Sequence, residues 1–229
     1  MLGILREAHS SLSRRRGVLA LHELLVLLTR VMADVSRAAD AAYLVGQTRD
    51  NAASVLCMGA ELLRQDLVPM LAVQKGGGNS GYCGFNYCLD ALRNLGVPPE
   101  AVAAVEFPEE MGRANTLTEH ISFARFAKQS GWGQILLVAP PFQQLRAFIS
   151  AVTAASREHP ALKIYNRVGW PLPWNQVATH SQGRLTERRT DLIIAEVERI
   201  GRYQRDGQPY PLVSTDAALE YLDRRDDAY

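Results

Sequence analysis

Short apolar runs alternate with amphipathic stretches along residues 40–170 of the chain. Runs of the first kind are typical of buried strands, and apolar positions spaced three and four residues apart are typical of helices. We expect strands at 41–47, 68–74, 101–107, 134–140 and 162–169, and helices at 51–65, 87–95, 120–130 and 143–156. Because each connection is short, the pattern predicts a Rossmann-like doubly wound α/β fold with a parallel sheet of about five strands.

Helical spacing also marks both flanks of this region. Residues 1–38 are predicted to be helical, and the sequence Trp-Pro-Leu-Pro-Trp at 170–174 indicates a linker. A long amphipathic helix at 184–207 and a short one at 216–222 are expected beyond it. The predicted divisions are an N-terminal helical segment (1–39), a Rossmann-like domain (40–170) and a C-terminal helical extension (171–229).

The composition is that of an ordinary soluble globular protein. The 229 residues are 47% hydrophobic and 21% charged, with a formal net charge of +1. This balance argues against a nucleic-acid partner and against a polybasic membrane anchor. The three cysteines form no metal-like pair, so we expect buried or idle thiols in a reducing cytoplasm.

Arg14-Arg15-Arg16 precedes an apolar run that could pass for a targeting signal. His22 and Glu23 interrupt the run, which is too short to span a bilayer. We interpret it as an amphipathic helix packed on the protein, and a twin-arginine export signal is the alternative.

Polar residues follow four of the predicted strands, and the carboxyl ends of parallel strands meet at one edge of the sheet, where such folds bind ligands. The four sets are Gly46, Gln47, Thr48 and Asp50; Lys75, Gly76, Gly77, Gly78 and Asn79; Arg113, Asn115, Thr116 and Glu119; and Pro140, Gln143, Gln144 and Arg146. The convergence of these sets predicts a ligand site more strongly than any single motif does.

Each motif also has a simpler interpretation. Asn115 or Thr116 could cap the following helix, with Glu119 completing a capping box. Asn51 is expected to cap the helix at 51–65. The glycines at 76–78 could form a nest for an anion or only a flexible loop. Arg146 could reach a phosphate or carboxylate at the rim, or lie on the surface of its helix.

Several chemistries lack their usual motifs in this sequence. No phosphate-binding loop with Gly-Lys-Ser/Thr occurs, no Gly-x-Gly-x-x-Gly fingerprint follows the first predicted strand, and no Gly-x-Ser-x-Gly elbow occurs. The histidines are scattered without ligand spacing, so no metal site is expected. His120 is expected on the solvated side of its helix.

Several elements occur in an order that resembles the YdcF-like (SanA/ElyC/YdcF) family, nearest the YdcF branch. They are Asp40 before a strand ending in Gly46, the glycine loop, Gly96-Val97-Pro98, Glu106, Asn115-Thr116-x-x-Glu119, and Pro-Pro-Phe-Gln-Gln-Leu-Arg-Ala at 140–147. The chain departs from the family at Gly84 or Phe85, where relatives usually carry a glutamate, and in a longer segment between Glu106 and Asn115.

The resemblance implies a Rossmann-like protein that binds S-adenosylmethionine at the carboxyl edge of its sheet. It implies a pocket lined by Gly76, Gly77, Asn115, Thr116, Glu119 and Arg146. We therefore expect Glu119 and Arg146 as the catalytic pair, and the cofactor-binding set Gly46, Gly76, Gly77, Gly78, Asn79, Arg113, Asn115, Thr116 and Gln143.

Three functions follow from these expectations. The first is a cytoplasmic binding protein or transferase for a nucleotide-like small molecule such as S-adenosylmethionine. The second is a phosphatase-like hydrolase, in which Arg113 and Arg146 hold a phosphate and Glu119 or Asp50 activates water. The third is a noncatalytic interaction protein whose terminal helices pair with another chain, for example as a homodimer.

Overall fold

The computed structural model of the chain describes residues 21–76, 81–108, 111–112, 114–180 and 183–227. Its centre is a five-stranded parallel sheet in the order β3-β2-β1-β4-β5. The strands are β1 (Ala41–Leu44), β2 (Leu71–Gln74), β3 (Val102–Val105), β4 (Gln134–Ala139) and β5 (Lys163–Val168). The strand order reverses between β1 and β4, which confirms the predicted Rossmann-like doubly wound fold.

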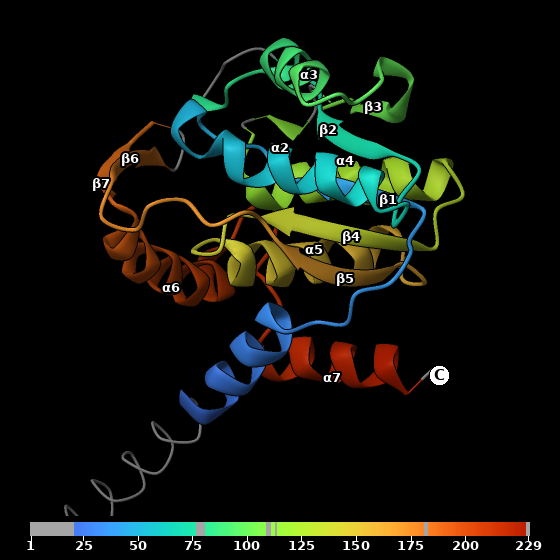
Figure 1. The fold of residues 1–229 in the computed structure, drawn as a ribbon. Helices are drawn as coiled ribbons and strands as arrows, with labels where there is room; N and C mark the ends of the chain where they lie inside the picture. The colour runs from blue at the N-terminus through green and yellow to red at the C-terminus, as the bar shows by residue number, and fades with distance from the viewer. Residues whose placement is uncertain (1–20, 77–80, 109–110, 113, 181–182, 228–229) are drawn as a thin grey trace, which may run out of the picture.

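Helices cover both faces of the sheet (Figure 1). They are a helix at 21–32, α2 (Arg49–Arg64), α3 (Phe85–Asn94), the 3-10 helix η2 (Pro99–Ala101), α4 (Thr116–Gln129), α5 (Gln144–Glu158), α6 (Arg189–Asp206) and α7 (Thr215–Asp226). The sheet separates two buried apolar clusters, one shared with α2 and α3 and the other with α4, α5, α6, α7 and the helix at 21–32.

Consecutive residues of the central strands supply the two clusters in turn. On β1, Ala42 and Leu44 belong to the cluster with α2, and Tyr43 belongs to the cluster with α4. A parallel strand covered on both faces needs apolar residues at every position. This requirement explains why the strands are continuous apolar runs in the sequence.

Most predicted elements are confirmed, with different ends. The strands are shorter than predicted; at β2, Pro69 has no amide hydrogen to donate, and the strand begins only at Leu71. The predicted helix over residues 1–38 is wrong for 34–38, which are not helical, and residues 1–20 lie outside the described residues. Asn51 does not cap α2, whose N-cap residue is Thr48.

A hairpin replaces the start of the long helix predicted at 184–207. Strands β6 (Val177–His180) and β7 (Leu185–Arg188) pair antiparallel, and α6 begins only at Arg189. The backbone of Thr179 fastens the hairpin to the start of α2: its carbonyl accepts from Thr48 Oγ1 at 2.6 Å and its amide donates to Asp50 Oδ2 at 2.7 Å. These long-range bonds override a local sequence with helical composition.

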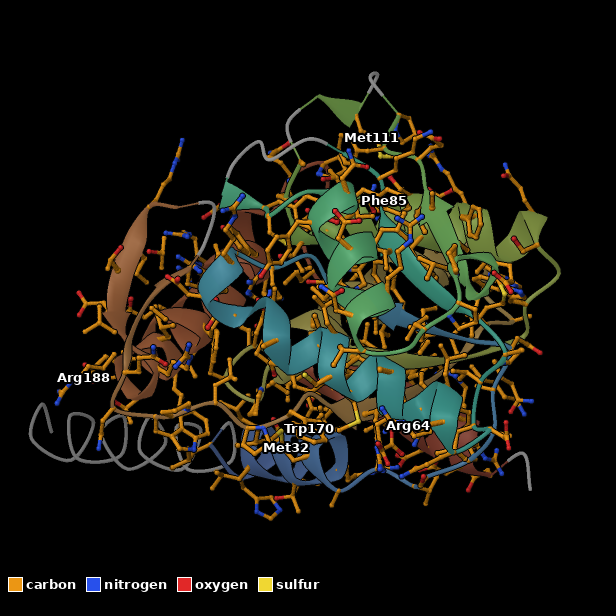
Figure 2. The ribbon with its side chains drawn as sticks, turned by 45° about the horizontal axis from the view of Figure 1, so that its top comes forward. Met32, Arg64, Phe85, Met111, Trp170 and Arg188 are labelled. Carbon is orange, nitrogen blue, oxygen red and sulfur yellow. The ribbon has the colours of Figure 1, made fainter. Side chains whose placement is uncertain are left out.

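The hairpin and α6 lie at the end of the molecule toward which the sheet strands point (Figure 1). Arg188, labelled in Figure 2 at the junction of β7 and α6, extends outward from this end. The helix at 21–32 lies beside α7, which is longer than the predicted helix at 216–222, and Arg30 pairs with Asp223 and Asp226 there. Among the described residues, no helix has the length and apolar character needed to cross a membrane.

Candidate functional site

A cavity of about 610 Å³ opens at the carboxyl edge of the sheet. It lies where the segments after β1 and β4 diverge, and the start of α4 and one side of α6 complete its wall. The predicted site residues that line it are Gly46, Gly76, Asn115, Thr116, Glu119, Gln143 and Arg146. The structure therefore brings together residues from four separate strand ends, as the sequence predicted.

The structure does not place every predicted site residue at the cavity. Four of them, Gly77, Gly78, Asn79 and Arg113, lie outside the described residues. Asp50 does not line the cavity, because its carboxylate holds the hairpin through the amide of Thr179.

Gln144 is also turned away from the cavity. Its side chain is buried and bonded to the backbone of β4, accepting from the amide of Ala139 and donating to the carbonyl of Leu137. It supports the sheet and offers nothing to a ligand.

Asn115 caps α4. Its side-chain oxygen accepts from the amides of Leu117 and Thr118 at 2.9 and 3.1 Å. The Thr118 hydroxyl accepts from the amide of Asn115 in return, so the second member of the capping box is Thr118, and the prediction of Glu119 in that role is wrong. Because the cap does not use Glu119, the carboxylate of that residue stays available to the cavity.

Glu119 lies on the first turn of α4 and is partly buried against the sheet. Its carboxylate has no hydrogen bond or ion pair within the described part of the chain, and a methyl group at Gly46 would lie 3.6 Å from its Oε2. Burial raises the pKa of Glu119 to about 7, against the opposing effect of the Arg146 charge. A carboxyl group with this pKa can accept or donate a proton near neutral pH.

Arg146 lies on the first turn of α5 and is buried, contrary to the alternative of a surface arginine. Its Nε donates to Glu196 Oε2 at 2.5 Å, and its Nη1 donates to Thr116 Oγ1 at 2.7 Å. These bonds fix the guanidinium between α4 and α6. Arg146 therefore reaches the cavity as a held positive charge that joins three elements.

Glu196, on α6, anchors this arrangement and was not predicted. Besides Arg146, it accepts from Arg199 Nη1 at 2.9 Å and contacts His180 Nε2 at 3.0 Å. Although burial opposes ionisation, the Arg146 and His180 partners lower the pKa of Glu196 to about 2. The pKa of His180 is lowered, because burial disfavours its charged form more than the neighbouring Glu196 carboxylate favours that form. Neutral His180 then donates its Nε2 hydrogen to the carboxylate.

His120 is buried, so its predicted position on the solvated side of α4 is wrong. Its Nδ1 donates to the carbonyl of Thr116, and its ring packs edge-on against Tyr43 with 5.5 Å between ring centroids. Burial lowers its pKa to about 4. His120 is thus a neutral residue packed in the interior against Tyr43.

Three glutamine residues at the ends of β1, β2 and β4 line the cavity. Gln47 Nε2 donates to Gln143 Oε1 at 2.8 Å, and Tyr43 donates to Gln74 Oε1 at 3.4 Å. Within the described part of the chain, Gln47 Oε1 and Gln74 Nε2 are buried without a partner. Unpaired buried polar atoms are costly, and these two belong to residues that line the cavity, where a ligand could satisfy them.

The C-terminal region supplies the wall that the sequence reasoning missed. Arg199, Arg202 and Asp206 of α6 line the cavity, and so does Arg184 from the hairpin. Their spacing of three and four residues along α6 puts the first three on one helix face. That stripe was the one sign in the sequence that α6 could line the cavity. It was missed because a charged stripe beyond a linker resembles an ordinary solvated helix face.

Positive charges predominate among the described lining residues. The cations are Lys75, Arg146, Arg184, Arg199 and Arg202, and the acids are Glu119 and Asp206. Part of this charge is already neutralised, because Lys75 pairs with Glu106 and Arg199 pairs with Glu196. The described residues contain no group of three His, Cys, Asp or Glu side chains placed to hold a metal ion.

Comparisons with known proteins do not extend this assignment. No model of a known protein family matches the sequence, and no curated protein matches it.

Proposed function

We propose that the chain binds a small anionic, nucleotide-like molecule in the cavity at the carboxyl edge of its sheet. The observation that carries the proposal is the position of the cavity at the point where strand order reverses between β1 and β4. Open α/β sheets bind ligands at this point, and a volume of about 610 Å³ is suitable for a molecule of nucleotide size.

The charged side chains suggest how such a ligand is oriented. Arg146, Arg184, Arg199 and Arg202 favour phosphate or carboxylate groups, which guanidinium groups can bind with two hydrogen bonds. Glu119 favours a different part of the ligand, because its carboxylate accepts hydrogen bonds from a ribose hydroxyl or an amine. A ligand with an anionic end and a hydroxyl-rich or amine-bearing end satisfies both.

S-adenosylmethionine belongs to this class, with a carboxylate, an amine and a ribose in one molecule. The resemblance to the YdcF-like family supports it as the first ligand to test, with transfer of its methyl group as the associated activity. The surplus of arginines favours a phosphorylated nucleotide as the competing ligand.

Isothermal titration of the full chain with S-adenosylmethionine, S-adenosylhomocysteine, nucleoside monophosphates and nucleoside diphosphates tests the proposal. We expect saturable binding of at least one of them, with Arg202→Gln weakening the affinity about tenfold, the size of one lost charge-assisted hydrogen bond. Arg205→Gln is the matched control, because Arg205 is an exposed residue of the same helix that does not line the cavity. Absence of heat with every ligand, or equal weakening by both variants, would refute the proposal.

Hydrolysis of a phosphorylated metabolite is a second candidate, and the pKa of Glu119 favours it. A general base works best when its pKa lies near the working pH, and that of Glu119 is about 7. In this reaction Glu119 takes a proton from water while the arginines hold the phosphate.

Glu119→Gln distinguishes the two candidates. For a hydrolase, the variant is expected to keep phosphate-ester binding and to lose turnover by a factor of about 100 or more, which is typical for a lost general base. Undiminished turnover in Glu119→Gln would exclude this role, and binding without turnover in the wild-type protein would leave the first candidate.

A further inference from the structure

Two cysteine thiols meet at the start of α3, beside the cavity. Cys83 precedes the helix, Cys88 lies in its first turns, and their sulfur atoms are 3.4 Å apart. Phe85, labelled in Figure 2, is the first residue of this helix. The proposed binding function uses neither thiol, and the sequence spacing of five residues predicted no pairing.

The surroundings of the pair distinguish its two members. The hydroxyl of Tyr82 lies 3.6 Å from Cys88 Sγ. Hydrogen bonds from Cys83 and Tyr82 lower the pKa of Cys88 against the effect of burial, whereas the bond to Cys88 and burial raise the pKa of Cys83. Cys88 is therefore the more acidic thiol of the pair, and it is the one better suited to attack an oxidant.

The backbone at Cys83 also allows the sulfurs to approach. A disulfide requires about 2.0 Å between sulfurs, so they must come closer by about 1.4 Å. Cys83 lies outside any helix or strand and is only partly buried. It is followed by Gly84, whose φ of 91° is accessible mainly to glycine. A short loop segment, and not the helix, can supply the movement.

We propose that Cys83 and Cys88 form an oxidation site, at which hydrogen peroxide converts the two thiols into a reversible disulfide beside the cavity. The Cys88 sulfur attacks one peroxide oxygen, the O–O bond breaks, and a sulfenic acid and one water result. The Cys83 sulfur then attacks the Cys88 sulfur and expels the second water. Two S–H bonds are replaced by one S–S bond, and the two electrons and two protons reduce the peroxide.

The disulfide would act on residues of the cavity through short connections. The amide of Cys83 donates to the carbonyl of Gln47 at 2.9 Å. Its neighbour Tyr82 donates to the carbonyl of Gln74 at 2.7 Å and lies next to Gly46. Moving Cys83 toward Cys88 therefore pulls on the segments at the ends of two strands, β1 and β2. This consequence, unlike the disulfide itself, rests on the proposed binding function.

Thiol counting with peptide mapping tests the oxidation site directly. Reduced full-length protein is treated with hydrogen peroxide, remaining thiols are alkylated, and the digest is analysed by mass spectrometry. We expect two of the three thiols to disappear, a peptide pair joined between Cys83 and Cys88 with the loss of two hydrogens, and full recovery on addition of dithiothreitol. Three alkylated thiols, a crosslink to Cys57, or irreversible oxidation without a crosslink would overturn the proposal.

Serine variants provide the matched controls. Cys57→Ser is expected to leave the crosslink intact, since Cys57 is on α2 and its thiol has no hydrogen bond within the described part of the chain. Cys83→Ser is expected to abolish the crosslink, and this partly exposed position keeps the test valid if buried Cys88→Ser fails to fold. A crosslink that survives in Cys83→Ser would contradict the assignment.

Titration of a nucleotide or S-adenosylmethionine into the reduced and oxidised protein tests the connection to the cavity. We expect about tenfold weaker binding after oxidation, a typical size for coupling between sites, and no such change in Cys83→Ser. Equal affinity of both forms would refute the connection. If neither form binds any ligand, the proposed binding function fails, whereas the crosslink stands or falls on the mass spectra alone.

Discussion

Two glutamates on either side of Arg146 have opposite environments. Glu196 on α6 has three cationic or hydrogen-bonding partners, and its pKa falls to about 2. Glu119 on α4 has no side-chain partner among the described residues, and its pKa rises to about 7. Burial disfavours the charge of both, so the difference lies in the partners. Glu196 is built to hold an arginine in place, and Glu119 is left available for a ligand or a proton.

The same contrast distinguishes the two regions of the cavity wall that carry these glutamates, α6 and the start of α4. The α6 region stabilises the folded protein through saturated interactions, and the start of α4 carries an unsatisfied charge that costs stability. Unsatisfied groups of this kind are concentrated at functional sites. In the proposed function, the chemistry therefore belongs to Glu119, and Glu196 positions Arg146.

Replacing Glu196 should have the largest effect. Glu196→Gln leaves Arg146 as an uncompensated buried charge, which costs about 3–5 kcal/mol of unfolding free energy. Because the folded pKa lies below the ordinary value of 4.5, the stabilisation from ionised Glu196 is present above that pH and is lost as pH falls toward 2. Urea unfolding at pH 7 measures the loss. Glu198→Gln is the control, since Glu198 is exposed on the same helix, and an equal loss in both variants would contradict the anchoring role.

Replacing Glu119 should have the opposite sign. Between pH 4.5 and about 7 the folded protein holds a proton that the unfolded chain has lost, so ionisation of Glu119 increasingly disfavours the folded state as pH rises. Glu119→Gln should therefore increase the unfolding free energy by about 3.5 kcal/mol above pH 7, because the pKa of Glu119 rises from 4.5 to about 7 and each pKa unit corresponds to about 1.4 kcal/mol. Urea unfolding at pH 5 and pH 8 checks this.

The gain from Glu119→Gln should shrink at pH 5, where the folded protein already carries a neutral side chain at this position. Glu100→Gln, at an exposed position, should change neither value. Loss of stability in Glu119→Gln at pH 8 would show that the carboxylate has a stabilising partner, and the comparison with Glu196 would fail.

The cap of α4 should give the smallest effect on stability. Asn115→Ala removes two hydrogen bonds to amides and should cost about 1 kcal/mol. Ser214→Ala removes the cap of α7, where Ser214 accepts from the amide of Ala217, and should cost a similar amount. Only Asn115→Ala should also weaken ligand binding, because its helix carries Glu119. Thermal unfolding and titration of both variants separate the two consequences, and equal ligand affinity in both would remove Asn115 from the site.

The fold was predictable from the sequence to a large extent, because a parallel sheet requires strands that are apolar on both faces. Tyr43 and Leu44 serve opposite faces of β1, and together they give the continuous run that the prediction used. The hairpin at Leu185–Arg188 was not predictable in this way. Its strands depend on bonds between Thr179 and α2, more than 120 residues away in the chain, and local composition favoured a helix there.

The same limit applies to the site. Residues at strand ends were predictable because parallel strands bring their carboxyl ends to one edge, and Glu119 and Arg146 were found by this rule. No such rule applies to α6, so Glu196 and Arg202 were missed. His120 was placed on the wrong side of α4, since helical spacing alone did not reveal which face packs on Tyr43.

The sequence by itself determined the doubly wound sheet and the edge at which polar groups collect, because hydrophobic period and strand order follow from local patterns. The tertiary structure decided what those groups can do. Whether a glutamate is an anchor or an available acid depends on the side chains that reach it from distant segments. Glu196 meets Arg146 across fifty residues of chain, whereas the Glu119 carboxylate has no hydrogen bond or ion pair within the described residues. Only the folded arrangement of α4, α5 and α6 makes that difference.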